Sequence, residues 1–181
     1  MEGEGHPRDT MFKDAVEALY NVAFTVKMIP KIKDNSIPGG HFDFVVPPLQ
    51  CQSWLTDTAT KFAWKLFILQ PDFVNEDLIK TAISIVEKKG KDLPLIHSLK
   101  FVTLHEGKCV QCLHIGPFNS VKSTYSKIED YMRERGFTEN GLWNEIYLSD
   151  QRKTPPEKLR TIIRCPVVSL HENGQKHALL S

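Results

Sequence analysis

The chain has 181 residues, and its 41% hydrophobic and 25% charged content is that of an ordinary globular protein. Lysine plus arginine (23) nearly balances aspartate plus glutamate (22), so the chain lacks the basic field that nucleic-acid binding requires. No apolar run approaches the roughly 20 residues that span a bilayer, and the N-terminus is polar rather than a secretory signal. We therefore expect a cytoplasmic protein that binds neither nucleic acid nor membrane.

The first half of the chain predicts a helix followed by two strands. Apolar residues recur at helical spacing from Asp9, a candidate N-cap, to Met28. Residues 40–49 are typical of a strand closed by two prolines, and residues 61–71 predict a second strand beyond a polar loop. Residues 1–5 fit the end of an opening strand.

The second half repeats this order after a connector. Asn75 caps a predicted connector helix that ends at residues 88–90, and residues 98–107 predict a strand. The remaining elements are a strand, a helix, and two further strands, at residues 108–117, 121–132, 143–150 and 158–167. The predicted helix ends before Gly136. The order predicts an α+β fold of two pseudo-twofold-related β-α-β-β modules, residues 1–72 and 106–168, joined by residues 73–105 and followed by a disordered tail, residues 169–181. Aligning the repeats places Asp43 opposite Glu145.

Two cysteines form a C-x-x-C motif, which can indicate a zinc or redox site. Cys109 and Cys112 lie in a predicted strand, however, where residues three apart face opposite sides. No second Cys/His pair stands at ligand spacing. We therefore expect structural thiols and no metal site.

The strand at residues 143–148 carries an unusual face. Trp143, Glu145 and Tyr147 alternate onto one side, and Leu142, Ile146 and Leu148 onto the other, which has the apolar character of a core side. A carboxylate between two large aromatic residues indicates either a solvated face or a ligand site.

Six runs are specific in their order and spacing: GEGHPRDTMF, YNVAFTVKM, LQPDFV, CVQCLHIGPF, EIYLSD and PEKLRTIIRCPV. Over residues 3–168 they resemble the GyrI-like small-molecule-binding domains, in particular a stand-alone branch with members that hydrolyse cyclopropanoid DNA-alkylating natural products. The resemblance implies a single GyrI-like domain over residues 1–168, with the family's Rob-type fold and a ligand cleft between its two modules. The chain departs from relatives in lacking most of the first strand, and in having Gln50 and Cys51 where relatives carry an acidic residue and a glycine.

The resemblance also implies site residues. It places the family's cleft carboxylate at Glu145 and the assisting tyrosine of the hydrolase branch at Tyr147. Aromatic candidates for ligand binding are Tyr20, Phe44, Trp54, Trp64 and Trp143, although Tyr20 and Trp64 also fit core positions. His114 is expected to make structural hydrogen bonds.

A carboxylate walled by aromatic rings suits two functions. Glu145 could act as a general base that activates water to open the cyclopropane ring of a cyclopropanoid compound, a reaction that needs neither a metal nor an organic cofactor. Alternatively, the protein could bind aromatic or cationic compounds without turnover. A third alternative is a protein-interaction module. The expected partner is a planar aromatic or cyclopropanoid small molecule, and the protein is expected to be a monomer or homodimer.

Overall fold

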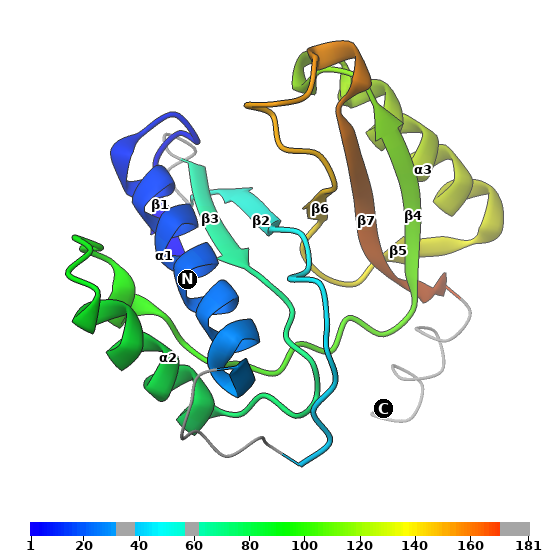
Figure 1. Cartoon of the computed structure of the whole chain (residues 1–181). Coiled ribbons are helices and arrows are strands. Elements are labelled where there is room, and N and C mark those ends of the chain that lie inside the picture. Colours follow the sequence, from blue (N-terminus) through cyan, green and yellow to red (C-terminus); the bar gives the residue numbers. More distant parts are fainter. Residues whose placement is uncertain (32–38, 57–61, 171–181) are drawn as a thin grey trace. The chain divides into compact units, whose positions relative to one another are not determined.

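The structure is a computed structural model that describes residues 1–31, 39–56 and 62–170, and it has the expected α+β architecture (Figure 1). The chain divides into two compact units. The first comprises Met1–Leu49 and Leu55–Thr103, and the second comprises Gln50–Trp54 and the chain from Leu104 onward. Within the described ranges, no helix is long and apolar enough to cross a bilayer.

The first unit contains two strands and two α-helices. Strand β1 (Glu2–Glu4) pairs antiparallel with β3 (Phe62–Phe67), which confirms the short opening strand expected at the N-terminus. Helix α1 (Thr10–Met28) lies beside α2 (Glu76–Lys88), as Figure 1 shows. Short 3-10 turns, η1 and η2, follow at Ile29–Lys31 and Ile96–Ser98. Apolar stripes of both helices form one core that includes Val22, Val26, Ile29, Val74, Ala82, Val86, Leu93 and Ile96.

The helix boundaries follow from local chemistry. The Asn75 side chain accepts a hydrogen bond from the Leu78 amide at 2.9 Å, which satisfies one of the free amides at the start of α2. Helix α3 ends at Gly136, whose left-handed backbone (φ 65°) is the conformation that glycine adopts without strain. Both ends were predicted from the sequence.

The second unit is an antiparallel sheet covered on one face by a helix. Its strands are β2 (Gln50–Leu55, with all but the last residue in this unit), β4 (Cys109–Ile115), β5 (Phe137–Glu139), β6 (Asn144–Tyr147) and β7 (Arg160–Ser169). The order is β2-β6-β7-β4, and β5 pairs with the end of β7. Helix α3 (Lys122–Arg135) packs on the sheet through Ile128 and Met132, and the 3-10 turns η3 and η4 lie at Phe118–Ser120 and Pro156–Lys158.

Strand register defines two faces of this sheet, because directly opposed residues project to the same side. Cys51, Glu145 and Ile163 are opposed in turn and lie on the face covered by α3, which we call the Glu145 face. Gln52, Asn144 and Arg164 are likewise opposed and lie on the other side, the Gln52 face.

The packing of β6 corrects the expected core side. The core of this unit, with Ile163 and Cys165, lies on the Glu145 face. On the other face Ile146 is buried, but Leu142 and Leu148 are 40% and 41% exposed. Hydrophobicity alone pointed to the wrong face, since α3 packs on the side where aromatic residues flank the carboxylate.

Four strand assignments also differ from expectation. Residues 41–49 form no strand, because Pro47 and Pro48 remove two amide donors and Phe44 packs into the core of the first unit instead. The following segment, expected to be a loop, is β2, so Cys51 and not Asp43 lies opposite Glu145. Residues 99–107 have no strand partner, and β5 was not anticipated. The expected tail lies outside the described residues from residue 171 onward.

Candidate active site around Glu145

The centre of the site is a half-buried carboxylate held by two phenol groups. The Tyr125 hydroxyl donates to Oε1 of Glu145 at 2.9 Å. The Tyr147 hydroxyl donates to Oε2 at 2.7 Å. Each carboxylate oxygen therefore has one donor and keeps further lone-pair capacity, because an ionised carboxylate accepts about four hydrogen bonds.

Two different elements supply the phenols. Tyr147 and Glu145 are two residues apart on β6, so both project onto the Glu145 face. Tyr125 lies in the first turn of α3, next to Thr124, whose hydroxyl is 2.9 Å from Nδ1 of the buried His114 on β4. This contact ties the start of α3 to the sheet, so His114 has the structural hydrogen bonds expected of it.

Aromatic rings surround the two phenols. The Trp143 and Tyr125 ring centroids are 4.9 Å apart with an interplanar angle of 43°. Phe118 meets Tyr147 edge-to-face with centroids 5.7 Å apart. The carboxylate thus lies among four aromatic side chains, a setting that attracts cations and flat rings.

The neighbouring groups keep their protons. Burial, followed by the negative charge of Glu145, raises the pKa of both Tyr125 and Tyr147 well above the usual value for a phenol. Burial, with a further contribution from the charge of Glu145, raises the pKa of the Cys51 thiol to about 12. At neutral pH the site therefore contains two phenol donors and an un-ionised thiol beside Glu145.

This arrangement has a defined chemical capacity. The phenols hold the carboxylate in one orientation and stabilise its charge through charge-assisted hydrogen bonds. The remaining lone pairs can accept a proton from water or a donor group of a ligand. The thiol is a poor nucleophile, because the thiolate is the reactive species and its population is small.

The structure brings together only some of the expected site residues. Glu145, Tyr147 and Trp143 form one cluster in the second unit. Tyr20, Phe44 and Trp64 belong to the first unit. Tyr20 accepts a hydrogen bond from the Leu49 amide at 3.3 Å and stacks on a phenylalanine, Phe44 packs against the core, and Trp64 is only 2% exposed.

Trp54 lies in β2 rather than in the loop expected for it. Strand alternation places its side chain on the same face as Gln52, opposite to Cys51 and Glu145. It is therefore not part of the cluster around Glu145.

Sequence reasoning missed Tyr125, Phe118 and Cys51. Tyr125 fits the apolar stripe of α3, so its position indicated only core packing. A half-buried tyrosine hydroxyl usually has a hydrogen-bond partner, and this rule was the available signal. The pairing of Cys51 with Glu145 spans 94 residues of sequence and left no local pattern.

The described residues contain no group of three or more His, Cys, Asp or Glu side chains placed to hold a metal ion. Cys109 and Cys112 lie on opposite faces of β4, since Cys112 is opposed to Ile163 of the Glu145 face and Cys109 is opposed to Pro166. This is the geometry that the strand spacing predicted.

The second unit is thus an α+β domain in which a helix backs a sheet and a carboxylate lies among aromatic rings. Comparison with family models matches residues 66–168 to the GyrI-like small molecule binding domain. A solved structure described as a hydrolase from Listeria innocua is 35% identical, with a TM-score of 0.81 over 92% of this chain and 84% of that one. A second, described as a hydrolase encoded by lin2189 from the same organism, is 34% identical with the same TM-score and coverage.

A third similar structure, 35% identical with a TM-score of 0.81, is described as an uncharacterized conserved protein from Listeria innocua and covers 92% of this chain and 85% of that one. No curated protein gives a significant match. The chain belongs to the GyrI-like small-molecule-binding domain family. Its fold is the GyrI-like fold, and the expected family resemblance is confirmed.

Proposed function

We propose that this protein is a hydrolase that opens the cyclopropane ring of cyclopropanoid DNA-alkylating compounds, and so removes their reactive electrophile. The observation that carries the proposal is the carboxylate of Glu145, which both phenols orient and which aromatic rings surround. The 35% identity to a structure described as a hydrolase supports an enzymatic role.

The reaction is the addition of water across a strained bond of a spiro-cyclopropyl dienone. A free lone pair of Glu145 accepts a proton as the water oxygen attacks the less hindered cyclopropane carbon. The new C–O bond forms, the C–C bond of the three-membered ring breaks, and its electron pair moves into the dienone. The dienone becomes a phenolate, which takes up a proton to give the phenol, and Glu145 returns its proton to solvent.

Each aromatic residue has a part in this scheme. Tyr147 and Tyr125 hold the carboxylate so that its free lone pairs point to one place, which lowers the entropic cost of aligning water. Trp143 and Phe118 supply ring faces and edges against which a flat substrate packs. The release of ring strain and the gain of aromaticity drive the reaction.

A second candidate function is binding without turnover. Two donors already engage the Glu145 carboxylate, and four aromatic side chains line its surroundings, which is also the arrangement of a receptor for a planar cation. In this case Glu145 supplies the counter-charge rather than accepting a proton.

The test is to incubate the purified protein with a synthetic cyclopropyl dienone and follow ring opening by absorbance and by the mass gain of one water. Turnover by the wild-type protein, and its loss in Glu145→Gln, supports the hydrolase. Saturable binding without any water adduct supports the binder. If neither binding nor turnover is seen at substrate solubility, both proposals are wrong.

A further inference from the structure

A row of polar side chains crosses the Gln52 face of the second unit. Strand register places Gln52 opposite Asn144, Asn144 opposite Arg164, and Arg164 opposite Gln111. The row therefore spans β2, β6, β7 and β4 at one level. Asn144 is fully buried and Gln52 is 6% exposed. Burying such groups costs free energy unless they are hydrogen-bonded, so packing alone does not explain the row.

Two side chains of this row, Arg164 and Asn144, donate hydrogen bonds to neighbouring side chains. Arg164 donates from Nε to Gln111 at 3.0 Å and from Nη1 to the Glu106 carboxylate at 2.9 Å. Asn144 donates from Nδ2 to the side-chain carbonyl of Gln50 at 2.6 Å. Oδ1 of Asn144 and Oε1 of Glu106 are buried and have no partner among the described residues.

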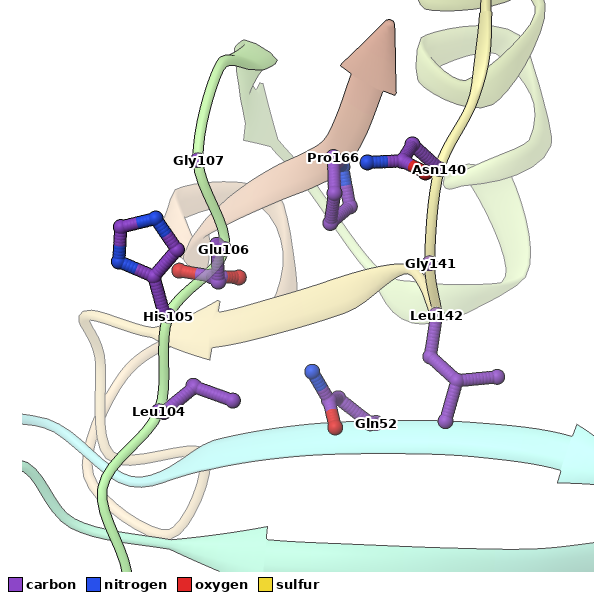
Figure 2. Close-up of a pocket in the computed structure, with 9 residues that line it drawn as sticks. All are labelled: Gln52, Leu104, His105, Glu106, Gly107, Asn140, Gly141, Leu142 and Pro166. Atoms are coloured by element: carbon purple, nitrogen blue, oxygen red, sulfur yellow. The ribbon is translucent and has the colours of Figure 1, made fainter. Parts of the chain in front are cut away.

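A pocket of about 400 Å³ lies over the Gln52 end of the row. Figure 2 shows Gln52, Glu106 and Asn140 at this pocket, on β2, on the segment before β4 and on the segment before β6. Leu104, Leu142 and Pro166 supply its apolar lining. The volume is within the range of small-ligand sites, roughly 300–1,000 Å³, and the mixture of an apolar wall with a few polar groups is also typical of them.

The hydrogen-bonding groups indicate the chemistry of the ligand. Arg164 neutralises Glu106, so the pocket does not require a cation, but the unpaired Oε1 of Glu106 requires an N–H donor. The Gln52 amide, which lines the pocket, offers both N–H donors and a carbonyl acceptor. A carboxamide matches this set, because its NH₂ donates and its carbonyl accepts.

We propose that this pocket is a second small-molecule site, which binds a neutral molecule with a primary carboxamide on a small flat ring. An amide N–H group supplies the donor that Glu106 lacks, and Gln52 pairs with the ligand amide. The ring packs against Leu104 and Leu142. Because Asn144 and Glu145 are adjacent on β6, this site and the proposed active site lie on opposite faces of one sheet.

The probe is nicotinamide, titrated into the isotopically labelled full-length protein and followed by the backbone amide signals. We expect saturable shifts at Gly107 and Gly141, which line the pocket. Methyl nicotinate keeps the ring and carbonyl but has no N–H donor, so it should bind at least about tenfold more weakly. Tenfold corresponds to about 1.4 kcal/mol, within the range for a hydrogen bond to a buried acceptor.

Matched variants separate this site from the proposed active site. Gln52→Leu removes the amide at similar size and should weaken nicotinamide binding about tenfold. Leu142→Trp, at a 40% exposed position where folding is not at risk, should fill the pocket and abolish the shifts. Glu145→Gln, on the other face, should leave the dissociation constant unchanged. Equal affinity for the two probes, unmoved signals at Gly107 and Gly141, or wild-type affinity in Leu142→Trp would each overturn the proposal.

Discussion

The substitution Glu145→Gln deletes the proton-accepting role of the site and keeps its shape. The amide oxygen can accept one of the two phenol hydrogen bonds. The amide nitrogen can only donate, so the other phenol must rotate its hydroxyl and accept. Loss of a general base typically lowers the rate by about 100- to 10,000-fold. Binding of a flat substrate should be nearly unchanged, because its contacts with the Trp143 and Phe118 rings do not involve the carboxylate.

The effect on folding stability follows from the same two contacts. Hydrogen bonds to a charged group contribute about 1.5–3 kcal/mol, and neutral ones about 0.5–1.5 kcal/mol. Removing the charge therefore costs about 1 kcal/mol per phenol, or about 2 kcal/mol in total. The loss of about 2 kcal/mol is an upper value, because Glu145 is half-buried and the variant no longer has to desolvate its charge on folding. The melting temperature should fall by no more than about 4–8 °C.

The two phenols report on the charge directly. In the wild-type protein, burial and then Glu145 hold the pKa of Tyr125 and Tyr147 well above 10, so stability should fall as the pH rises above about 10, where tyrosines of the unfolded chain ionise. In Glu145→Gln both tyrosines should titrate at lower pH, although burial still keeps their pKa above the usual value for a phenol.

The assays are substrate turnover, fluorescence binding, and ultraviolet titration of phenolate. Equal turnover by the two proteins would refute the assignment of the base, and an unchanged tyrosine titration would refute the contact geometry.

Three further predictions address other residues. Tyr147→Phe should lower kcat by about tenfold, a smaller loss than in Glu145→Gln, because it removes an orienting hydrogen bond and keeps the ring. A larger loss in steady-state kinetics would indicate that the phenol itself transfers a proton. Cys51 should resist a thiol reagent at pH 8, because with a pKa of about 12 only about one thiol in ten thousand is ionised. Peptide mapping that finds Cys51 alkylated in the folded protein would contradict its burial. Gly3→Ala should destabilise the first unit by about 1–3 kcal/mol in denaturant unfolding, because the added Cβ would overlap the ring of the buried Trp64. Wild-type stability of this variant would show that the indole can move aside.

Local sequence patterns determined the helices and part of the site. Apolar spacing, the Asn75 cap and Gly136 predicted α2 and the end of α3, because these features act within one or two turns. The i, i+2 spacing of Glu145 and Tyr147 placed them on one strand face, because side chains alternate along any strand. The family resemblance added the role of the carboxylate, which periodicity cannot supply.

Tertiary structure decided which distant residues complete the site. Strand β2 forms at Gln50–Leu55 rather than at residues 41–49 because this segment pairs with β6. Its partners on β6 lie more than 90 residues further along the sequence. Tyr125 reaches Glu145 only because α3 packs on that face of the sheet. The polar row on the Gln52 face likewise exists only across four strands in register. Such contacts depend on pairing and packing of separate elements, and neither the hydrophobicity nor the local conformational preference of a single segment encodes them.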